Sequence, residues 1–287
     1  MMSSLQGKID YSIALIRKTE KLALAMSGEG FHVGFSGGKD SQVLLELVKM
    51  AGVKYRAVYN VTTNDPVENV RFIREKYPDV IFDRPEESFF QLVARKGLPT
   101  RRMRYCCAIL KERSGSGKVV LTGIRAEESF KRSQYAEVRK FGNDKDKEID
   151  LDKMEQAHFR CVGGKDKFMA YPILRWTERD VWRFIRERGL PINPCYEIQR
   201  RVGCVFCPFA PKKQIMRHIK EKPGQYRALL HCLQKFLDRA DGRGITRHFS
   251  TAEEYFQWWV EKENIKIYKE KKKQTTIQFD YEEEDNV

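Results

Sequence analysis

The apolar residues of this chain follow two patterns that alternate along the sequence. Short runs of apolar and β-prone residues have the length of buried strands, and they occupy residues 31–35, 55–63, 80–82 and 117–123. Other stretches place apolar residues on one face at helical spacing, and they occupy residues 42–50, 66–77 and 87–96. Thr177, with Asp180 three residues later, predicts the capped start of a further helix. Strands that alternate with helices predict an α/β fold with a doubly wound, mostly parallel sheet.

The two ends of the chain show helical spacing without strands between the helices. Residues 5–28 predict an N-terminal helix, and residues 225–240 and the stretch after Ser250 predict helices near the C-terminus. Lysines and then acidic residues dominate the last part of the chain. We therefore expect an N-terminal helix over 1–30, an α/β domain over 31–210, a helical C-terminal region over 211–270 and a charged tail over 271–287.

A glycine-rich hexapeptide, Ser-Gly-Gly-Lys-Asp-Ser at 36–41, joins the first predicted strand to the helix that follows it. Its glycines let backbone N–H groups approach phosphate oxygens, and the N-terminus of the helix adds partial positive charge. The lysine adds a full charge, and the serines add hydroxyl donors. The pattern therefore favours a phosphate-binding loop over a plain turn. The nucleotide-binding residues it predicts are Ser36, Gly37, Gly38, Lys39, Asp40 and Ser41.

Polar residues also lie where other predicted strands end, at the edge where parallel sheets bind ligands. Asn60 and Thr62 are placed to contact adenine or ribose, although turn residues of no further role have the same pattern. Gly123 ends another strand, and Arg125 and Arg132 beyond it are suited to clamp a phosphate or sulfate group. The alternative for both arginines is a solvated surface position.

Two cysteine pairs form a second candidate site. Cys106 and Cys107 are adjacent, and Cys204 and Cys207 have the two-residue spacing that lets both sulfurs reach one metal centre. Four thiolates suit a [4Fe–4S] cluster or, as the alternative, a structural zinc ion, whereas each cysteine alone is also compatible with a buried thiol. Cys195 is the alternative ligand if only one of the adjacent pair takes part. Basic residues surround the adjacent pair, and we expect them to lower the thiol pKa.

Composition narrows the class of partner. The chain has 54 basic and 40 acidic residues, and this net charge of +14 favours a polyanionic partner such as DNA or RNA. It contains no apolar run of transmembrane length and begins without a signal-peptide pattern, so we expect a cytoplasmic protein without a membrane partner. There its seven cysteines stay reduced, which favours metal or redox roles over disulfides.

The hexapeptide at 36–41 resembles the PP-loop of N-type ATP pyrophosphatases, which cleave ATP between its α and β phosphates. The motif order over about residues 30–210 resembles the phosphoadenosine phosphosulfate (PAPS) reductase family, which implies the adenine nucleotide α-hydrolase-like fold. The motifs that match are the loop, Gly-Ile-Arg-Ala-Glu-Glu-Ser at 123–129, Trp-Thr-Glu-Arg-Asp-Val-Trp at 176–182 and the cysteine pairs. In the adenylyl-sulfate reductase branch such pairs ligate a [4Fe–4S] cluster, which here implies Cys106, Cys107, Cys204 and Cys207.

One departure from that family bears on the reaction. The chain lacks the Glu-Cys-Gly-Leu-His segment that carries the catalytic cysteine of the reductases, and its last cysteine, Cys232, lies in an apolar helical pattern. The sequence is therefore more similar to reductase-related proteins that use ATP and thiols to modify nucleic acid. This resemblance implies ATP and Mg²⁺ as cofactors and an acceptor that is adenylated before sulfur transfer. The catalytic residues it implies are Lys39, Asp40, Arg125 and Arg132.

The resemblance also sets the expected partners and the alternatives. An adenine nucleotide and a nucleic acid are expected, a sulfur-donor protein is a candidate, and a homodimer or a larger complex is compatible with the sequence. The first alternative function is a PAPS or adenosine phosphosulfate reductase that releases sulfite. The second is a non-catalytic subunit that binds nucleotide and nucleic acid.

Overall fold

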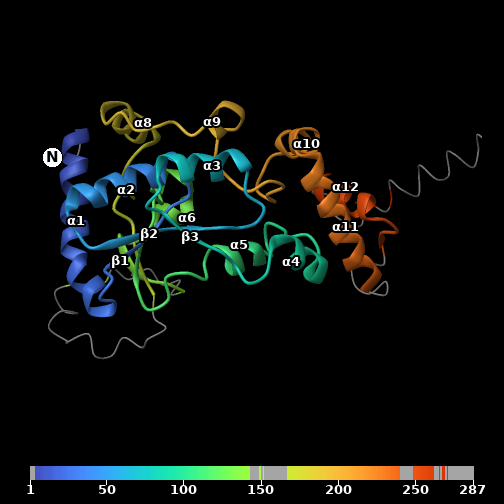
Figure 1. The fold of residues 1–287 in the computed structure, drawn as a ribbon, viewed down its shortest axis with the longest axis horizontal. Helices are drawn as coiled ribbons and strands as arrows, with labels where there is room; N and C mark the ends of the chain where they lie inside the picture. The colour runs from blue at the N-terminus through green and yellow to red at the C-terminus, as the bar shows by residue number, and fades with distance from the viewer. Residues whose placement is uncertain are drawn as a thin grey trace, which may run out of the picture. The chain divides into compact units, whose positions relative to one another are not determined.

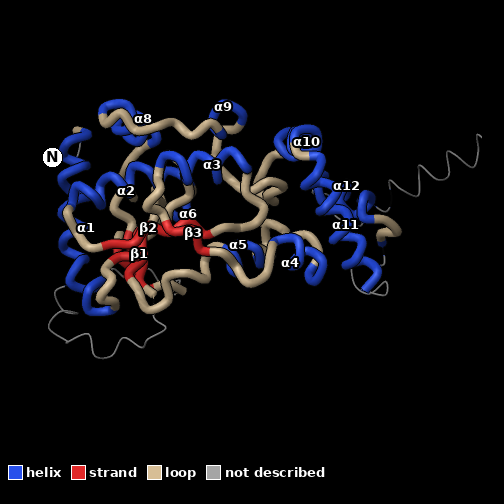
Figure 2. Tube along the Cα trace, in the orientation of Figure 1, coloured by secondary structure: helices blue, strands red, loops and turns tan. Residues whose placement is uncertain are grey.

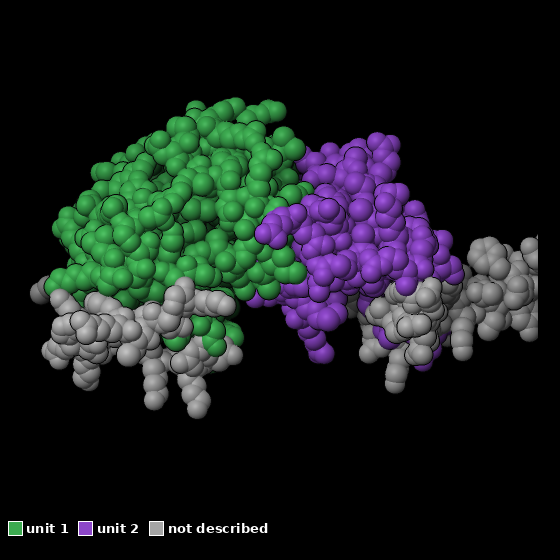
Figure 3. Space-filling model, turned by 60° about the horizontal axis from the view of Figure 1, so that its bottom comes forward, with its two compact units in different colours: residues 1–85, 108–203 green, residues 86–107, 204–287 purple. Residues whose placement is uncertain are grey.

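The computed structural model describes residues 4–142, 149, 151, 167–239, 248–261, 265, 267, 268 and 270. The chain divides into two compact units, which Figure 3 shows in different colours. Unit 1 consists of residues 1–85 and 108–203, and unit 2 consists of residues 86–107 and 204–287. The expected charged tail over 271–287 lies outside the described residues.

Unit 1 is built on a sheet that has six strands within the described residues, several of them labelled in Figure 2. Their order across the sheet is β3-β2-β1-β4-β6-β5. Neighbouring strands are parallel except for β5, which pairs antiparallel with β6. The strands are β1 (Phe31–Gly34), β2 (Tyr55–Asn60), β3 (Ile81–Asp83), β4 (Val119–Leu121), β5 (Val138–Lys140) and β6 (Phe168–Ala170). The predicted α/β fold with a mostly parallel sheet is confirmed.

Helix α1 precedes the first strand, and the other helices of unit 1 come after strands along the chain (Figure 1). They are α1 (Leu5–Met26), α2 (Lys39–Ala51), α3 (Val67–Lys76), the 3₁₀ helix η1 (Ala126–Glu128), α6 (Phe130–Ser133), α8 (Glu178–Glu187) and α9 (Cys195–Ile198). Helix α1 begins where the Ser4 side chain accepts the Gly7 N–H, and α2 ends at Gly52 in the left-handed conformation. Helix α2 packs against both α1 and α8, which makes it the central helix of this unit.

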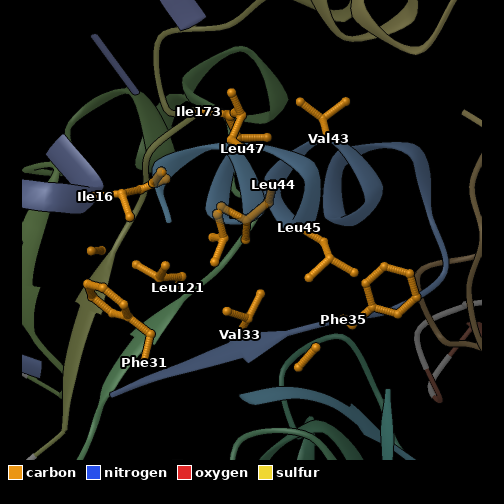
Figure 4. Close-up of a cluster of buried hydrophobic side chains, with 14 of the residues drawn as sticks. Ile16, Phe31, Val33, Phe35, Val43, Leu44, Leu45, Leu47, Leu121 and Ile173 are labelled. Atoms are coloured by element: carbon orange, nitrogen blue, oxygen red, sulfur yellow. The ribbon is translucent and has the colours of Figure 1, made fainter. Parts of the chain in front are cut away.

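The core of unit 1 lies between α2 and the sheet (Figure 4). Val33 of β1 and Leu121 of β4 are fully buried together with Leu44 and Leu47 of α2 and Ile16 of α1. Burying a side chain of this size stabilises the fold by about 1.5–3 kcal/mol. Because this core fixes β1 and α2 against each other, it also fixes the ends of the loop that joins them.

Unit 2 is helical within the described residues. Its elements are α4 (Phe89–Lys96), the start of α5 (Tyr105–Leu110), α10 (Lys212–Glu221), α11 (Pro223–Arg239) and α12 (Ala252–Glu261). Helix α4 packs against α11, and Leu92, Val93, Leu229 and Leu233 on these helices are fully buried. Helix α11 also contacts α10 and α12. The predicted helical C-terminal part is therefore present.

Several details differ from the sequence expectations. Strands β5 and β6 were not predicted, although β3 and β4, which have the same length, overlap predicted strands. The strand predicted to reach Thr63 ends at Asn60, and Thr63 itself has a φ of 59°. The division into units does not follow the expected limits at 30 and 210, because residues 86–107 group with the C-terminal helices, and those limits stay a prediction. Among the described residues, no helix combines the length and apolar character needed to cross a membrane.

Candidate nucleotide-binding loop and cysteine group

The loop at 36–41 follows β1, where the order of the strands across the sheet reverses. The chain continues to β2 on one side of β1 and later to β4 on the other side. Parallel sheets bind ligands at such a switch point. Gly38 is the N-cap of α2, so the loop includes N–H groups of the first turn that no helix carbonyl accepts. Gly37 has a φ of +75°, and a Cβ there would lie 2.3 Å from Asn69 Oδ1, so glycine is required.

Buried amide side chains hold the carbonyl groups of this loop. Asn193 Nδ2 donates to Gly37 O at 2.9 Å and to Asn69 Oδ1 at 2.7 Å. Asn69 Nδ2 donates in turn to Ser36 O at 3.2 Å, and Gln42 Nε2 donates to Gly37 O at 3.3 Å. These amide donors occupy the carbonyl side of the loop, whereas on its N–H side the Lys39 N–H donates to the Tyr196 hydroxyl at 2.8 Å.

Ser41 closes the loop on itself. Its Oγ donates to Gly38 O at 2.8 Å and accepts the Ser36 N–H at 3.2 Å. The Ser41 side chain is buried, and the Ser36 hydroxyl lies 3.1 Å from it. The two serines of the motif therefore fix the shape of the loop, in addition to any contact that they make with a ligand.

A chain of ion pairs crosses the loop. Lys39 Nζ lies 3.2 Å from Asp40 and 3.8 Å from Glu178 at the start of α8. Arg125 Nε lies 2.7 Å from Asp40, and its Nη1 lies 2.7 Å from Glu127. Burial lowers the pKa of Arg125, but the carboxylates of Asp40 and Glu127 outweigh burial and raise this pKa overall. Arg125 therefore stays charged, and carboxylates lie beside both cations before any anion binds.

Gly123 allows β4 to approach the loop closely. A Cβ at this position would lie 2.8 Å from the carbonyl carbon and oxygen of Asp40, so no larger residue fits without a backbone shift. This close approach brings Arg125, two residues further on, within reach of Asp40. The structure thus places Gly123 and Arg125 at the loop, as the sequence predicts for a shared site.

The two predicted residues after β2 lie at the adjacent strand end. Asn60 Nδ2 donates to Lys111 O at 3.1 Å, whereas its Oδ1 is buried and accepts no hydrogen bond from the described residues. Thr62 is buried, and its N–H donates to Asp65 at 2.7 Å. On the other side of β1, Thr122 Oγ1 is likewise buried without a partner among the described residues. Polar groups thus flank β1 on both sides.

Arg132 is placed differently from Arg125. It belongs to the short helix α6, and its guanidinium pairs with Glu128. The same carboxylate accepts the backbone N–H of Arg125 at 3.2 Å. Arg132 therefore holds Glu128, which in turn accepts the backbone N–H of Arg125, and the positive charge of Arg132 is paired with the Glu128 carboxylate.

The cysteine pairs both belong to unit 2. Cys107, Cys204 and Cys207 all act electrostatically on Cys106, which indicates that the four sulfurs lie in one region of unit 2. The hydrogen bond with Cys107, burial and these charges raise the pKa of Cys106. The expectation that nearby arginines lower this pKa is wrong for Cys106, because Arg101, Arg102 and Arg104 are exposed.

The described cysteines do not have the arrangement of a set of metal ligands. Within the described part of the chain, no group of three or more His, Cys, Asp or Glu side chains has the arrangement of a metal site. Cys195, the alternative ligand, is buried in α9 of unit 1, and its N–H donates to Asn193 Oδ1 at 2.9 Å. The assignment of ligands to an iron–sulfur cluster or a zinc ion therefore stays a proposal.

Several residues at the loop were not predicted from the sequence. Asn69, Asn193 and Gln42 hold its carbonyls, and Tyr196 and Glu178 contact Lys39. Asn193 stands between two prolines in Pro-Ile-Asn-Pro, which indicates a turn but not a buried brace. Asn69 and Tyr196 carry no sequence signal for this role, because only the folded chain brings them to the loop.

This fold and this loop define a class of protein. A parallel sheet whose interior strand leads into a glycine-rich, lysine-containing loop at a helix N-terminus is the architecture of a nucleotide-binding α/β domain. Residues 31–210 match the family described as phosphoadenosine phosphosulfate reductase domain, and the chain belongs to this family. The family resemblance expected from the motifs is confirmed.

Individual relatives are distant. An uncharacterized protein of Methanocaldococcus jannaschii is 26% identical over 221 residues, which cover 72% of this chain and 42% of that protein. The chain thus spans less than half the length of this relative. The adenosine 5'-phosphosulfate reductase of Bacillus mycoides is 26% identical over 187 residues, which cover 60% of this chain and 70% of that enzyme.

Among solved structures, the U34-tRNA thiolase NcsA of Methanococcus maripaludis with its [4Fe-4S] cluster is similar with a TM-score of 0.42 and 12% sequence identity. The similarity covers 86% of this chain and 82% of that chain. It is a similarity of fold alone.

Proposed function

We propose that this protein binds ATP at the loop 36–41 and cleaves it between the α and β phosphates, adenylating an acceptor for sulfur transfer. The observation that carries the proposal is the loop itself. It has the full Ser-Gly-Gly-Lys-Asp-Ser sequence, it lies at the switch point of a parallel sheet, and it holds the buried Lys39 at the start of α2.

In this proposal, the residues of the loop hold the leaving pyrophosphate. Backbone N–H groups and the Lys39 ammonium bind its oxygens and stabilise the negative charge that develops as it departs. Asp40 is the carboxylate on the loop assigned to the Mg²⁺ that accompanies ATP, since Mg²⁺ binds one or two carboxylates together with phosphates. Arg125 holds Asp40 in place at 2.7 Å, and Asn60 and Thr122 offer buried oxygens for the nucleoside.

The chemistry has two steps. An acceptor oxygen forms a bond to the α-phosphorus, the bond from that phosphorus to the bridging oxygen breaks, and pyrophosphate leaves. The sulfur of a donor then bonds to the acceptor atom that carried the adenylated oxygen, and AMP leaves with that oxygen. We assign nucleic acid as the acceptor because the chain has a net charge of +14 and presents exposed arginines at 101, 102 and 104.

The cysteine group belongs to the proposal as a site for a [4Fe–4S] cluster. Cys106, Cys107, Cys204 and Cys207 supply the four thiolates that such a cluster needs. The support is their gathering in unit 2 and the donor type, with zinc as the alternative occupant. When bound, a cluster would hold or deliver sulfur, and neither adenylation nor the displacement of AMP depends on it.

A second function is favoured by one specific observation. The relative in Bacillus mycoides is named an adenosine 5'-phosphosulfate reductase, and the similarity covers 70% of it. A reductase of this kind would bind a sulfated nucleotide at the same loop and release sulfite. Against it stands the absence of the Glu-Cys-Gly-Leu-His segment and the position of Cys232 inside α11, where burial raises its pKa.

Pyrophosphate release from ATP by anaerobically purified protein tests the proposal, with and without RNA or DNA. We expect release that depends on nucleic acid and is lost in Lys39→Ala. The matched control is Lys49→Ala, which removes an exposed lysine from the same helix and should change nothing. No release under any condition, together with sulfite formed from a sulfated nucleotide, would replace the proposal by the reductase.

A further inference from the structure

Tyr196 is an unassigned residue that reaches the phosphate loop. It belongs to α9, and its hydroxyl accepts the backbone N–H of Lys39 at 2.8 Å. This N–H is the first of α2, a donor for which the helix offers no carbonyl. Such donors hold phosphate oxygens in nucleotide-binding loops. A tyrosine oxygen therefore already lies among the groups that a phosphate contacts.

The position of Tyr196 is tied to that of the loop. Asn193, three residues earlier, donates to Gly37 O and accepts the N–H of Cys195 at 2.9 Å. The Tyr196 ring packs edge-to-face with the Trp182 ring, with centroids 5.3 Å apart. These contacts hold the hydroxyl against the loop from the backbone side and from the ring side.

The Tyr196 hydroxyl lies close to the loop backbone as well. A Cβ at Gly38 would lie 3.3 Å from its oxygen and 3.8 Å from Val202, so the segment from Tyr196 to Val202 covers this glycine. A glycine at this position keeps the space between the loop and that segment open. A phosphate in the loop would therefore have the segment as a neighbour.

The Tyr196 hydroxyl can still donate one hydrogen bond. A phenol has one proton and two lone pairs, and the Lys39 N–H uses one lone pair. No described residue accepts its proton in a hydrogen bond. A phenol keeps this proton at neutral pH, so the hydroxyl is a neutral donor.

The surroundings of the hydroxyl favour an anion as the acceptor. The Lys39 ammonium lies 5.9 Å from the centre of the Tyr196 ring. The negative charge of Asp40 and the positive charge of the exposed Arg201 both act on Tyr196. The N-terminus of α2 adds its partial positive charge at the same place. A phosphate oxygen is the acceptor that fits two cations, a helix N-terminus and a neutral hydroxyl donor.

We propose that Tyr196 is a phosphate-binding residue whose hydroxyl accepts the Lys39 N–H and donates its proton to a phosphate oxygen of the bound nucleotide. This inference rests on the proposed function, because it takes the loop to be the phosphate site. It extends that site from one contiguous motif to a second segment about 160 residues further along the chain.

Calorimetric titration of Tyr196→Phe with ATP and with pyrophosphate tests the inference. A hydrogen bond to a charged group is lost while the ring stays, so we expect affinity to fall at least about tenfold for both ligands. Tyr11→Phe is the matched control, because Tyr11 lies on the exposed part of α1, and it should bind like the wild type. Unchanged or tighter binding in Tyr196→Phe would overturn the inference, and tighter binding would identify the hydroxyl as a competitor for the amide.

Two further measurements keep the result interpretable. If the wild type binds neither ligand, the proposed function itself fails, whereas normal binding by both proteins removes only the role of Tyr196. Circular dichroism verifies that Tyr196→Phe is folded. If Tyr196→Phe is not folded, the test uses the fluorescence of Trp182 in the wild type, because the Trp182 ring contacts Tyr196. Pyrophosphate should change this emission, and Trp182→Phe gives the background signal. The absence of a change would contradict the inference.

Discussion

The glycine-rich loop of unit 1 and the cysteine group of unit 2 differ in how many of their groups are held by contacts within the polypeptide. At the loop, Asn69 and Asn193 hold the backbone carbonyls, and the charges of Lys39 and Arg125 are balanced by carboxylates. In unit 2 the sulfurs gather near Cys106, yet no ligand set is formed among the described residues. The loop therefore has visible braces, whereas the cysteines share a region of unit 2.

The difference has a physical origin. Backbone N–H groups are neutral dipoles, so a fold can align several of them before a ligand arrives. Thiolates carry full negative charges that repel one another, and the charge of a metal is needed to hold them together. The raised pKa of Cys106 is the expected state of such a group in the polypeptide alone. Substitutions should therefore affect the two sites in different ways.

The largest effect is expected where a buried charge of the loop loses its partner. Arg125→Ala removes a side chain that is 4% exposed and leaves Asp40 and Glu127 without their shared cation. Asp40 keeps Lys39 as a partner and Glu127 is half exposed, so the loss is that of two hydrogen bonds to carboxylates, about 3 kcal/mol in the free energy of unfolding, measured by urea unfolding. Arg132→Ala, which removes the more exposed pair with Glu128, should cost at most about 1 kcal/mol. Equal costs for the two variants would contradict the pre-organised loop.

The next effect is expected at the braces of the loop. Asn193→Ala leaves the Gly37 carbonyl and the Cys195 N–H with fewer partners in a fully buried place, which should cost about 2–3 kcal/mol of stability. ATP affinity should fall with it, because the N–H groups are no longer held. Calorimetry and urea unfolding together check this, and full ATP affinity in a destabilised variant would show that the brace serves stability alone.

A smaller effect is expected from pH. Burial, with the charges of Lys118 and Lys167, lowers the pKa of His32 on β1 to about 4. The folded chain therefore keeps His32 neutral while the unfolded chain binds a proton near pH 6.5, so stability is complete above pH 6.5 and falls as pH decreases toward 4. The loss at pH 5 should be about 2 kcal/mol. His32→Gln should remove this part of the pH dependence of stability. A variant whose stability falls with decreasing pH in the same way as the wild type would contradict the assignment to His32.

The smallest effect on nucleotide binding is expected from unit 2. Cys204→Ser should lower the iron bound after anaerobic reconstitution, whereas ATP affinity should stay within about twofold of the wild type. Cys232→Ser is the control, because Cys232 lies on α11 outside the cysteine pairs, and it should keep its iron. A loss of ATP affinity in Cys204→Ser would show that the two sites depend on each other.

Local patterns in the sequence predicted most of the framework. The run before the loop is β1, the stretch after it is α2, and Thr177 caps α8 with Asp180 at its third position. Each of these signals lies within a few neighbouring residues, where spacing and capping chemistry act directly. The glycine-rich motif at 36–41 was recognisable for the same reason, since it lies in six consecutive residues, and its role in phosphate binding stays a prediction.

Contacts between distant segments were not predictable in this way. Asn193 reaches Gly37 over 156 positions and Tyr196 reaches Lys39 over 157, and neither has a local pattern that marks it. The grouping of residues 86–107 with the C-terminal helices likewise depends on the packing of α4 against α11. Arg125 could be predicted at a strand end, but its pairing with Asp40 required the close approach at Gly123.

The packing of α4 against α11 has a consequence for how the protein folds during its synthesis on the ribosome. Val93 of α4 leaves the ribosome 136 residues before Leu229 of α11, and both are fully buried in the folded chain. At about 5–20 residues per second, α4 waits roughly 7–27 s for the helix that covers it. During that interval its apolar face is open to chaperones and to other nascent chains. Unit 2, and with it the cysteine group, is therefore completed only when translation of the chain nears the last helices.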